Sequence, residues 1–275
     1  MKHLWLTILL DISESLRARW FLLYTTVFGG IIVLLFVFGL TESRIMGFTG
    51  LTRLLLTYIQ LCIAILPVFV LISTVRSVAG DKEAGVFEYL LSLPVSLSAW
   101  YWGKMLGRFI VIFIPVFLAM AAAVGWALWR GVIVPWELFA LYTGLLIALA
   151  WCFLGMGMLI SSIARSVDIA QGTAFFLWLF LLLFLDLILL GLMVREQFSP
   201  EPLILIALTN PLQTFRTGAM LLFDPQLILL GPTAYVILDI FGQTGYLVWS
   251  FGYPLVLGTV CAIIGYKLFR RGDLL

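Results

Sequence analysis

The chain alternates between long apolar runs and short polar stretches, and the lengths of the apolar runs give the first structural signal. A helix needs about 20 mostly apolar residues to cross a bilayer, because each residue adds only about 1.5 Å to its length. Six runs are long enough, and five of them contain no charged residue. They predict an all-α integral membrane protein, a single transmembrane domain over 1–275, with six transmembrane helices at 20–40, 54–75, 109–129, 138–164, 169–194 and 240–266.

Two shorter apolar pieces, Pro202–Leu208 and Pro225–Leu238, do not fit this pattern. The first is too short to cross a bilayer, and the second contains Gly231-Pro232, which disfavours a continuous helix. We interpret both as interfacial or re-entrant segments, and a seventh span over the second is the alternative. Between them, Asn210-Pro211 predicts a short outer helix, with Asn210 as its cap and Pro211 as its first residue.

The first nineteen residues carry apolar side chains at fourfold spacing, with acidic and basic residues toward their end. Such spacing places side chains on one face of a helix. We therefore expect an N-terminal amphipathic helix along the inner membrane surface before the first span, and a simple polar leader is the alternative. The apolar residues are Leu4, Ile8, Ile12 and Leu16.

The segment Gly80–Ser96, between the second and third spans, is charged and patterned, whereas a simple turn would need only a few polar residues. We expect a short helix over 81–93 at the membrane face, ended by a proline and available to a soluble partner. Glu83 and Glu88 offer charge to that partner, and Phe87 offers an anchor that could fill a pocket. The alternative is a helix that rests on the lipid, with Phe87 among the headgroups.

Six spans put both termini on the same side of the membrane. Eleven of the sixteen Lys and Arg residues then fall on that side. The positive-inside rule therefore places both termini, and the segment Gly80–Ser96, in the cytoplasm.

Composition narrows the possible functions. The chain is 63% hydrophobic with a mean hydropathy of +1.16, and its net charge of +2 gives no basis for nucleic-acid binding. The sequence contains no P-loop, no His-Glu-x-x-His and no Gly-x-Ser-x-Gly, so we expect no ATP site and no enzymatic chemistry in this chain. His3 is the only histidine, and the three cysteines stand far apart in apolar runs, so we expect no metal site or cofactor.

Two intramembrane features remain. Asp186 lies in the middle of the fifth expected span, where a charge costs on the order of 2.5–3.5 kcal/mol, so it should face protein or water. It could be a polar point on a translocation path or a subunit seam, or an aspartate hydrogen-bonded to a neighbouring helix, and both hypotheses stay open. Gly155-Met156-Gly157-Met158 fits close helix packing better than a path for a soft metal.

Together these residues resemble the type-2 ABC transporter permeases. In that family the second span is followed by a cytoplasmic coupling helix. The sequence of this region contains, in order, acidic residues, a Gly-x-x-Glu element, Leu-Leu-Ser-Leu-Pro-Val-Ser and a Gly-Lys pair. This chain has Asp81-Lys82-Glu83-Ala84-Gly85-Val86-Phe87-Glu88, then Leu90–Ser96, then Gly103-Lys104.

Within that family the chain is most similar to the permeases of nitrous oxide reductase maturation. One departure is Gln213-Thr214, where a more acidic or aliphatic pair is expected. The likeness to this subfamily rests on Asp11–Trp20, Gly47-Phe48-Thr49, Phe184–Leu187, Asn210–Arg216 and Phe269-Arg270-Arg271.

The resemblance implies a homodimer in a bacterial or archaeal inner membrane, driven by a separate cytoplasmic ATPase that binds ATP and Mg. It also implies a periplasmic accessory protein. The permease would either export a substrate or act mechanically on that accessory protein, as part of copper-site maturation. The residues expected to meet the ATPase are Asp81, Glu83, Gly85, Phe87, Glu88 and Leu91, and those expected to meet the outer partner are Asn210, Pro211 and Arg216.

Two other classes of function stay open. A secondary carrier or channel would need several buried polar residues, and one intramembrane acid argues against it. A non-transporting assembly scaffold would bind its partners through the same cytoplasmic segment. For a transporter, the substrate is undetermined: copper, a sulfur species, a lipid-like molecule or purely mechanical work all fit an apolar bundle.

Overall fold

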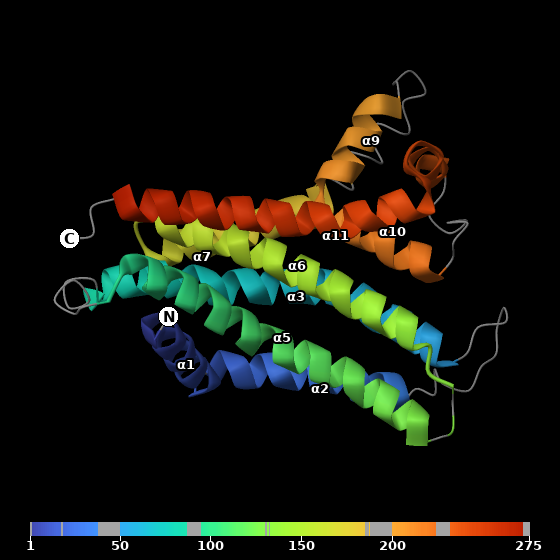
Figure 1. The fold of residues 1–275 in the computed structure, drawn as a ribbon, viewed down its shortest axis with the longest axis horizontal. Helices are drawn as coiled ribbons and strands as arrows, with labels where there is room; N and C mark the ends of the chain where they lie inside the picture. Colours follow the sequence, from blue (N-terminus) through green and yellow to red (C-terminus); the bar gives the residue numbers. More distant parts are fainter. Residues whose placement is uncertain are drawn as a thin grey trace.

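The structure is a computed structural model that describes residues 2–17, 19–37, 50–86, 95–129, 131, 133–184, 187, 200–223 and 232–271. Every regular element within these ranges is helical, which confirms the all-α prediction (Figure 1). The helices are α1 (Lys2–Arg17), α2 (Arg19–Val37), α3 (Gly50–Glu83), α5 (Leu97–Trp129), α6 (Trp136–Ile163), α7 (Val167–Leu179), the π-helical η1 (Phe180–Phe184), α9 (Pro200–Thr209), α10 (Pro211–Phe223) and α11 (Pro232–Arg271).

Several helices are long and apolar enough to cross a membrane, as expected for a multi-pass protein. The described apolar parts of two other expected spans, Phe21–Ile31 and Val167–Leu183, are shorter, and the second of these spans continues outside the described residues. The count of six spans and their bounds therefore stay a prediction. Among the described residues, four segments are long enough: Thr57–Glu83, Leu97–Trp129, Trp136–Ile163 and Phe241–Arg271.

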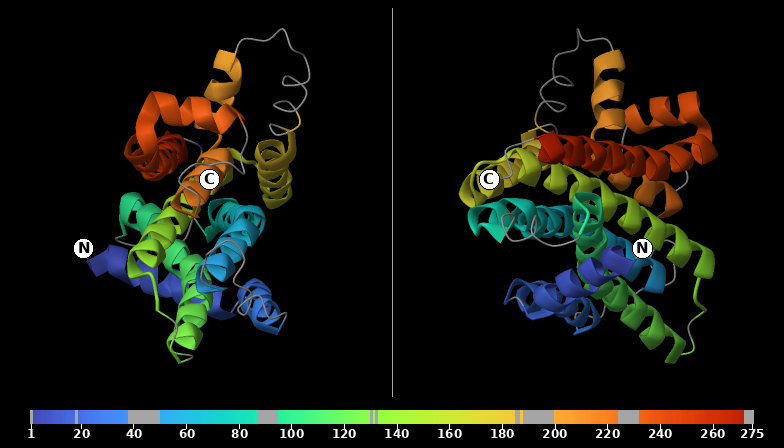
Figure 2. Two further views of the ribbon diagram at one scale, coloured as in Figure 1. Left: turned by 90° about the vertical axis from the view of Figure 1, so that its right-hand side faces the viewer. Right: turned by 60° about the vertical axis from the view of Figure 1, so that its left-hand side comes forward.

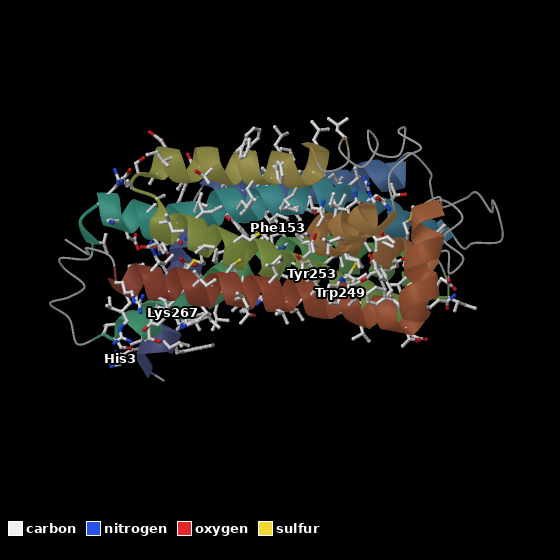
Figure 3. All side chains as sticks on the ribbon, turned by 90° about the horizontal axis from the view of Figure 1, so that it is seen from above. His3, Phe153, Trp249, Tyr253 and Lys267 are labelled. Atoms are coloured by element: carbon white, nitrogen blue, oxygen red, sulfur yellow. The ribbon has the colours of Figure 1, made fainter. Side chains whose placement is uncertain are left out.

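Helix α6 is central to the bundle. It lies between α3 and α11, and all three run lengthwise beside one another (Figures 1 and 2). Phe153, in the middle of α6, is fully buried, as are Tyr58 of α3 and Tyr101 of α5 (Figure 3 labels Phe153). The core thus forms where these three helices meet, and α7 covers the side of α3.

Small residues let α6 approach its neighbours closely. A Cβ added to Gly155 would lie 1.9 Å from the carbonyl oxygen of Gly258 in α11, and one added to Gly157 would lie 2.9 Å from Cβ of Thr74 in α3. Gly155 is therefore required by close packing against the backbone of α11, and Gly157 by close packing against the side chain of Thr74. This confirms the interpretation of Gly155 and Gly157 as helix-packing residues.

Helix α11 bends sharply near its start. Gly242 has φ 66° and ψ 166°, a conformation that glycine adopts without strain, and the part before it lies across the rest of the helix (Figure 1). After the bend, Trp249 and Tyr253 stack with ring centroids 5.1 Å apart. Trp249 Nε1 donates to the carbonyl oxygen of Leu208 at 3.2 Å, so α11 holds the end of α9 (Figure 3).

Helix α1 forms as predicted, but its buried face differs from the predicted apolar stripe. Ile8 is buried, whereas Leu16 is 49% exposed, and Asp11 and Ser15 are buried instead. The reason is the fit of α1 against α5, described below, which buries small and polar side chains. The exposed face of α1 carries Trp5, Leu6, Leu9 and Leu10.

Candidate functional site

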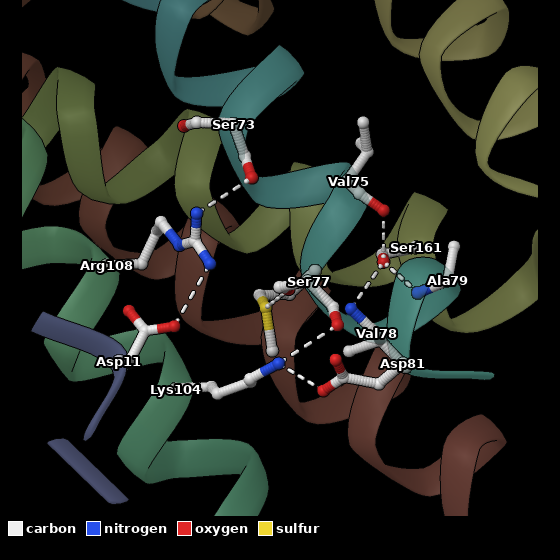
Figure 4. Close-up of polar contacts among 11 residues, drawn as sticks. Asp11, Ser73, Val75, Ser77, Val78, Ala79, Asp81, Lys104, Arg108 and Ser161 are labelled. Carbon is white, nitrogen blue, oxygen red and sulfur yellow. Dashed lines mark hydrogen bonds and ion pairs between the residues drawn. The ribbon is translucent and has the colours of Figure 1, made fainter. Parts of the chain in front are cut away.

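The last turns of α3 contact α5, α6 and α7 at one end of the bundle, and Arg108 of α5 links them to α1; this set of contacts is the candidate site. Helix α1 lies at this end, and α11 ends there (Figure 1). We call the contacts the polar junction (Figure 4). Its side chains are Asp11 of α1, Asp81 and Glu83 of α3, Lys104 and Arg108 of α5, and Ser161 of α6.

The sequence of α5 builds the junction with two interleaved pairs at helical spacing. Gly103 and Gly107 face α1: a Cβ on Gly103 would lie 2.7 Å from Cβ of Thr7, and one on Gly107 would lie 3.0 Å from Cβ of Asp11. The residues that follow them, Lys104 and Arg108, are also four apart and share a neighbouring face. Close packing of α1 on α5 therefore brings Asp11 beside two cations.

Arg108 joins α1 to α3. Its Nη2 donates to Oδ1 of Asp11 at 3.0 Å, and its Nη1 donates to the carbonyl oxygen of Ser73 at 3.3 Å. The side chain of Asp11 is fully buried, and that of Arg108 is 17% exposed. Burial raises the pKa of Asp11, and the charges of Arg108 and Lys104 oppose that rise. A buried pair of this kind holds helices in register, since a charge left alone would be costly.

Lys104 holds the last turn of α3. It forms an ion pair with Asp81 and donates to the carbonyl oxygen of Ser77 at 3.1 Å. Its Nζ also lies 5.0 Å from the ring centroid of Trp100, within reach of a cation–π contact. Because Lys104 is 5% exposed, these three partners replace nearly all of its water.

Ser161 fastens α6 to the same turns. Its Oγ donates to the carbonyl oxygen of Val75 at 2.6 Å and accepts from the backbone N–H groups of Val78 at 3.1 Å and Ala79 at 2.9 Å. The hydroxyl thus lies between the carbonyl oxygen of Val75 and the N–H of Ala79, two groups that would bond each other directly in an uninterrupted helix. Helices α3 and α6 cannot slide here without breaking three hydrogen bonds.

Glu83 connects the end of α3 to the start of α7. Its Oε1 accepts from the backbone N–H of Val167 at 2.7 Å, and Ser166 Oγ accepts from Ile169 at 3.3 Å. The two acceptors cap the first turn of α7, where unpaired N–H groups and the helix dipole favour a carboxylate. Gly85 follows with φ 68° in the turn that ends α3.

The expected helix over 81–93 differs from the structure in its first part. Residues 81–83 are the last residues of α3, and a turn at Ala84–Gly85 follows. The reason is that Lys104 pairs with Asp81 and the backbone N–H of Ala84 donates to the carbonyl oxygen of Gly80 at 3.0 Å, so α3 continues past Gly80. Phe87, Glu88, Leu91 and Asp186 lie outside the described residues, so their predicted roles stay predictions.

Asn210 and Pro211, two of the residues expected to meet an outer partner, are packed between helices in this chain. Asn210 Oδ1 accepts from the N–H of Leu212 at 3.0 Å, which confirms the predicted cap of α10. However, its Nδ2 donates to the carbonyl oxygen of Leu181 at 2.9 Å, and both Asn210 and Pro211 are buried. They join α9, α10 and η1, whereas Arg216 is partly exposed, and the predicted contact of these residues with an outer partner stays a prediction.

Sequence reasoning missed Asp11, Arg108, Lys104 and Ser161 as members of the site. The signal for two of them, Lys104 and Arg108, was present in Gly103-Lys104 and Gly107-Arg108, since glycines and cations repeat there with the same spacing. No local signal marked Ser161, because serine is common in apolar helices.

Comparison with known proteins places the chain in a family. The model of the family described as ABC-2 family transporter protein matches residues 5–274. A similar protein from Stutzerimonas stutzeri, named as a probable ABC transporter permease protein NosY, is 27% identical over 222 residues, which cover 78% of this chain and 80% of the relative. A protein of the same name from Pseudomonas aeruginosa is 27% identical over 233 residues, with 82% and 84% covered. The chain therefore belongs to the ABC-2 family of transporter proteins, as a NosY-like permease subunit whose family implies an ATPase partner.

Proposed function

We propose that this chain couples ATP hydrolysis by a separate cytoplasmic ATPase to movement of its transmembrane helices. The observation that carries the proposal is the polar junction. It ties the last turn of α3 to α5, α6 and α7, and through Arg108 to α1, immediately before the segment 87–94. A force applied to that segment would reach five helices together. Such contacts favour movement of packed elements as bodies over local bending.

The contact with the ATPase belongs, in this proposal, to Phe87, Glu88 and Leu91. The carboxylates of Asp81 and Glu83 already bind Lys104 and the start of α7, so we assign them a positioning role. Gly85 supplies the turn that leads from α3 to the contact segment. ATP and Mg would be held by the ATPase, and this chain would contribute no cofactor.

The assembly that we propose is a homodimer in a bacterial or archaeal inner membrane, with both termini in the cytoplasm. The excess of Lys and Arg residues expected on the side of the polar junction supports this orientation. Movement would export a substrate or act on a periplasmic accessory protein, with Arg216 at the outer contact and Asp186 on the path or the subunit seam. A role in copper-site maturation of nitrous oxide reductase rests only on similarity to the NosY permeases.

Co-purification with a candidate cytoplasmic ATPase tests the proposal. The test variant is Phe87→Ala with Glu88→Arg, which leaves the bonds of the polar junction intact. The control is Ile133→Ala, an 87% exposed apolar residue beyond the far end of α5. We expect wild type and Ile133→Ala to retain an ATPase-active complex and the double variant to lose it. If wild type binds no ATPase, or the double variant binds equally well, the carrier and scaffold hypotheses replace this one.

A further inference from the structure

A cavity lies beside the polar junction and is lined by residues of α1, α2, α3 and α5. It contains about 470 Å³ of space not filled by atoms, part of it open to the surroundings. Its polar lining residues are Ser15, Ser73 and Arg108, and the remaining lining is apolar or aromatic. Arg108 therefore belongs both to the junction and to the wall of this cavity.

The polarity of the lining changes in one direction along two helices. On α3, Phe69 lies four residues before Ser73, which places it about 6 Å farther from the junction. On α5, Ile112 lies four residues after Arg108 and is displaced in the same direction, because the two helices run oppositely. The cavity is thus polar toward the junction and apolar toward the middle of the bundle.

Two residues that line this space, Tyr24 and Arg108, carry buried polar atoms without partners. Among the described residues, Tyr24 has a 4% exposed side chain whose hydroxyl makes no hydrogen bond, and Tyr24 lines the cavity. Nε of Arg108 and Oδ2 of Asp11 also lack partners. Such groups are uncommon, since most buried donors and acceptors are bonded to protein or to a bound molecule. Because the two donors belong to residues that line the cavity, a molecule bound there should supply oxygen acceptors.

We propose that this cavity binds one acyl chain and the glycerol-phosphate oxygens of a bilayer glycerophospholipid from the leaflet next to the polar junction. The polarity gradient matches the orientation of such a lipid, with its head toward the junction and its chain toward the bilayer centre. The ester and phosphate oxygens provide the acceptors that Tyr24 and Arg108 lack. The exposed apolar face of α1, which carries Trp5 and Leu9, is suited to lie in the same interface.

The test uses the full chain in nanodiscs of phosphatidylethanolamine and phosphatidylglycerol, with a trace of phosphatidylglycerol carrying a diazirine on one acyl chain. After illumination, mass spectrometry maps the labelled residues. We expect enriched labelling near Phe69 and Ile112, relative to the lipid-facing residues Leu255 and Val256 of α11. Ile72→Trp, which fills the cavity, should abolish the enrichment, whereas Leu118→Trp on the exposed face of α5 should not.

Tyr24→Phe separates lipid binding from folding. Because its hydroxyl has no partner in the protein, the variant should unfold at the wild-type temperature or above it in lipid-free detergent. It should nevertheless lose enriched labelling by about fivefold, the effect of one hydrogen bond of about 1 kcal/mol. The proposal is overturned if labelling at the cavity only equals that on α11, if Tyr24→Phe leaves it unchanged, or if a diazirine fatty acid labels the site while the phospholipid does not.

Discussion

The close contact between α6 and α11 predicts a large effect from adding a single methyl group. In Gly155→Ala the new Cβ would lie 1.9 Å from the carbonyl oxygen of Gly258, with the carbonyl carbon and Cα of Gly258 at 2.6 and 2.7 Å. All three atoms are backbone atoms, so rotation of a side chain cannot relieve the clash. The Cβ and the oxygen must separate by at least 1.1 Å, from 1.9 Å to the 3.0 Å below which such contacts essentially never occur.

The free-energy cost of that separation depends on how tightly α6 and α11 are packed. Overpacking a tight core costs about 1–3 kcal/mol, and a clash between two backbones should fall at or above the upper end of that range. For a chain of this size, about 3 kcal/mol corresponds to a fall in unfolding temperature on the order of 10 °C. The fall is measured by thermal unfolding of purified protein in detergent, followed by tryptophan fluorescence.

A matched control is Gly125→Ala in α5, where an added Cβ meets no atom within 4 Å. Alanine is a better helix former than glycine by about 1 kcal/mol, so this variant should unfold at the wild-type temperature or a few degrees higher. If Gly155→Ala unfolds at the same temperature as Gly125→Ala, the close approach of α6 and α11 is wrong.

Two further predictions concern the polar junction. Because burial raises the pKa of Asp11 above its ordinary value near 3.8, the folded protein binds this proton more tightly than the unfolded chain. Stability should therefore fall as pH rises from about 3.8 to the raised pKa, and Asp11→Asn should remove this contribution from a series of unfolding temperatures against pH. Glu83→Gln should weaken the cap of α7 by about 1 kcal/mol and speed hydrogen exchange at the Val167 amide about fivefold. Unchanged exchange, or an equal effect from the exposed Glu137→Gln, would show that Glu83 does not cap α7.

The features that sequence predicted well are those set by neighbouring residues. Apolar runs of sufficient length became the long helices α3, α5, α6 and the main part of α11, because hydrophobicity and helical bonding act locally. The cap at Asn210 was also local, since it depends on a side chain and the amides that follow it. Gly155 and Gly157 could be assigned to packing, although not to their partners in α11 and α3.

The polar junction could not be predicted in the same way because its bonds join distant parts of the chain. Ser161 binds Val75 across 86 positions, and Arg108 binds Asp11 across 97. Periodicity within α1 reflects that helix alone. It predicts that the apolar residues at fourfold spacing form the buried face of the helix. The glycines of α5 instead bring that helix close enough to bury Asp11, so tertiary packing overrides the pattern.

Arg108 gives the two proposals a physical connection. It bonds Asp11 and Ser73 in the polar junction, and it lines the cavity together with Ser73. A lipid oxygen bound to Nε of Arg108 would therefore be sensitive to any movement of α3 that changes the Ser73 bond. If the ATPase shifts α3 between two positions, the lipid must bind one of them better, and by thermodynamic reciprocity the lipid must then favour that position. ATPase activity of the complex should accordingly depend on the phospholipid, and Tyr24→Phe should weaken that dependence without changing assembly.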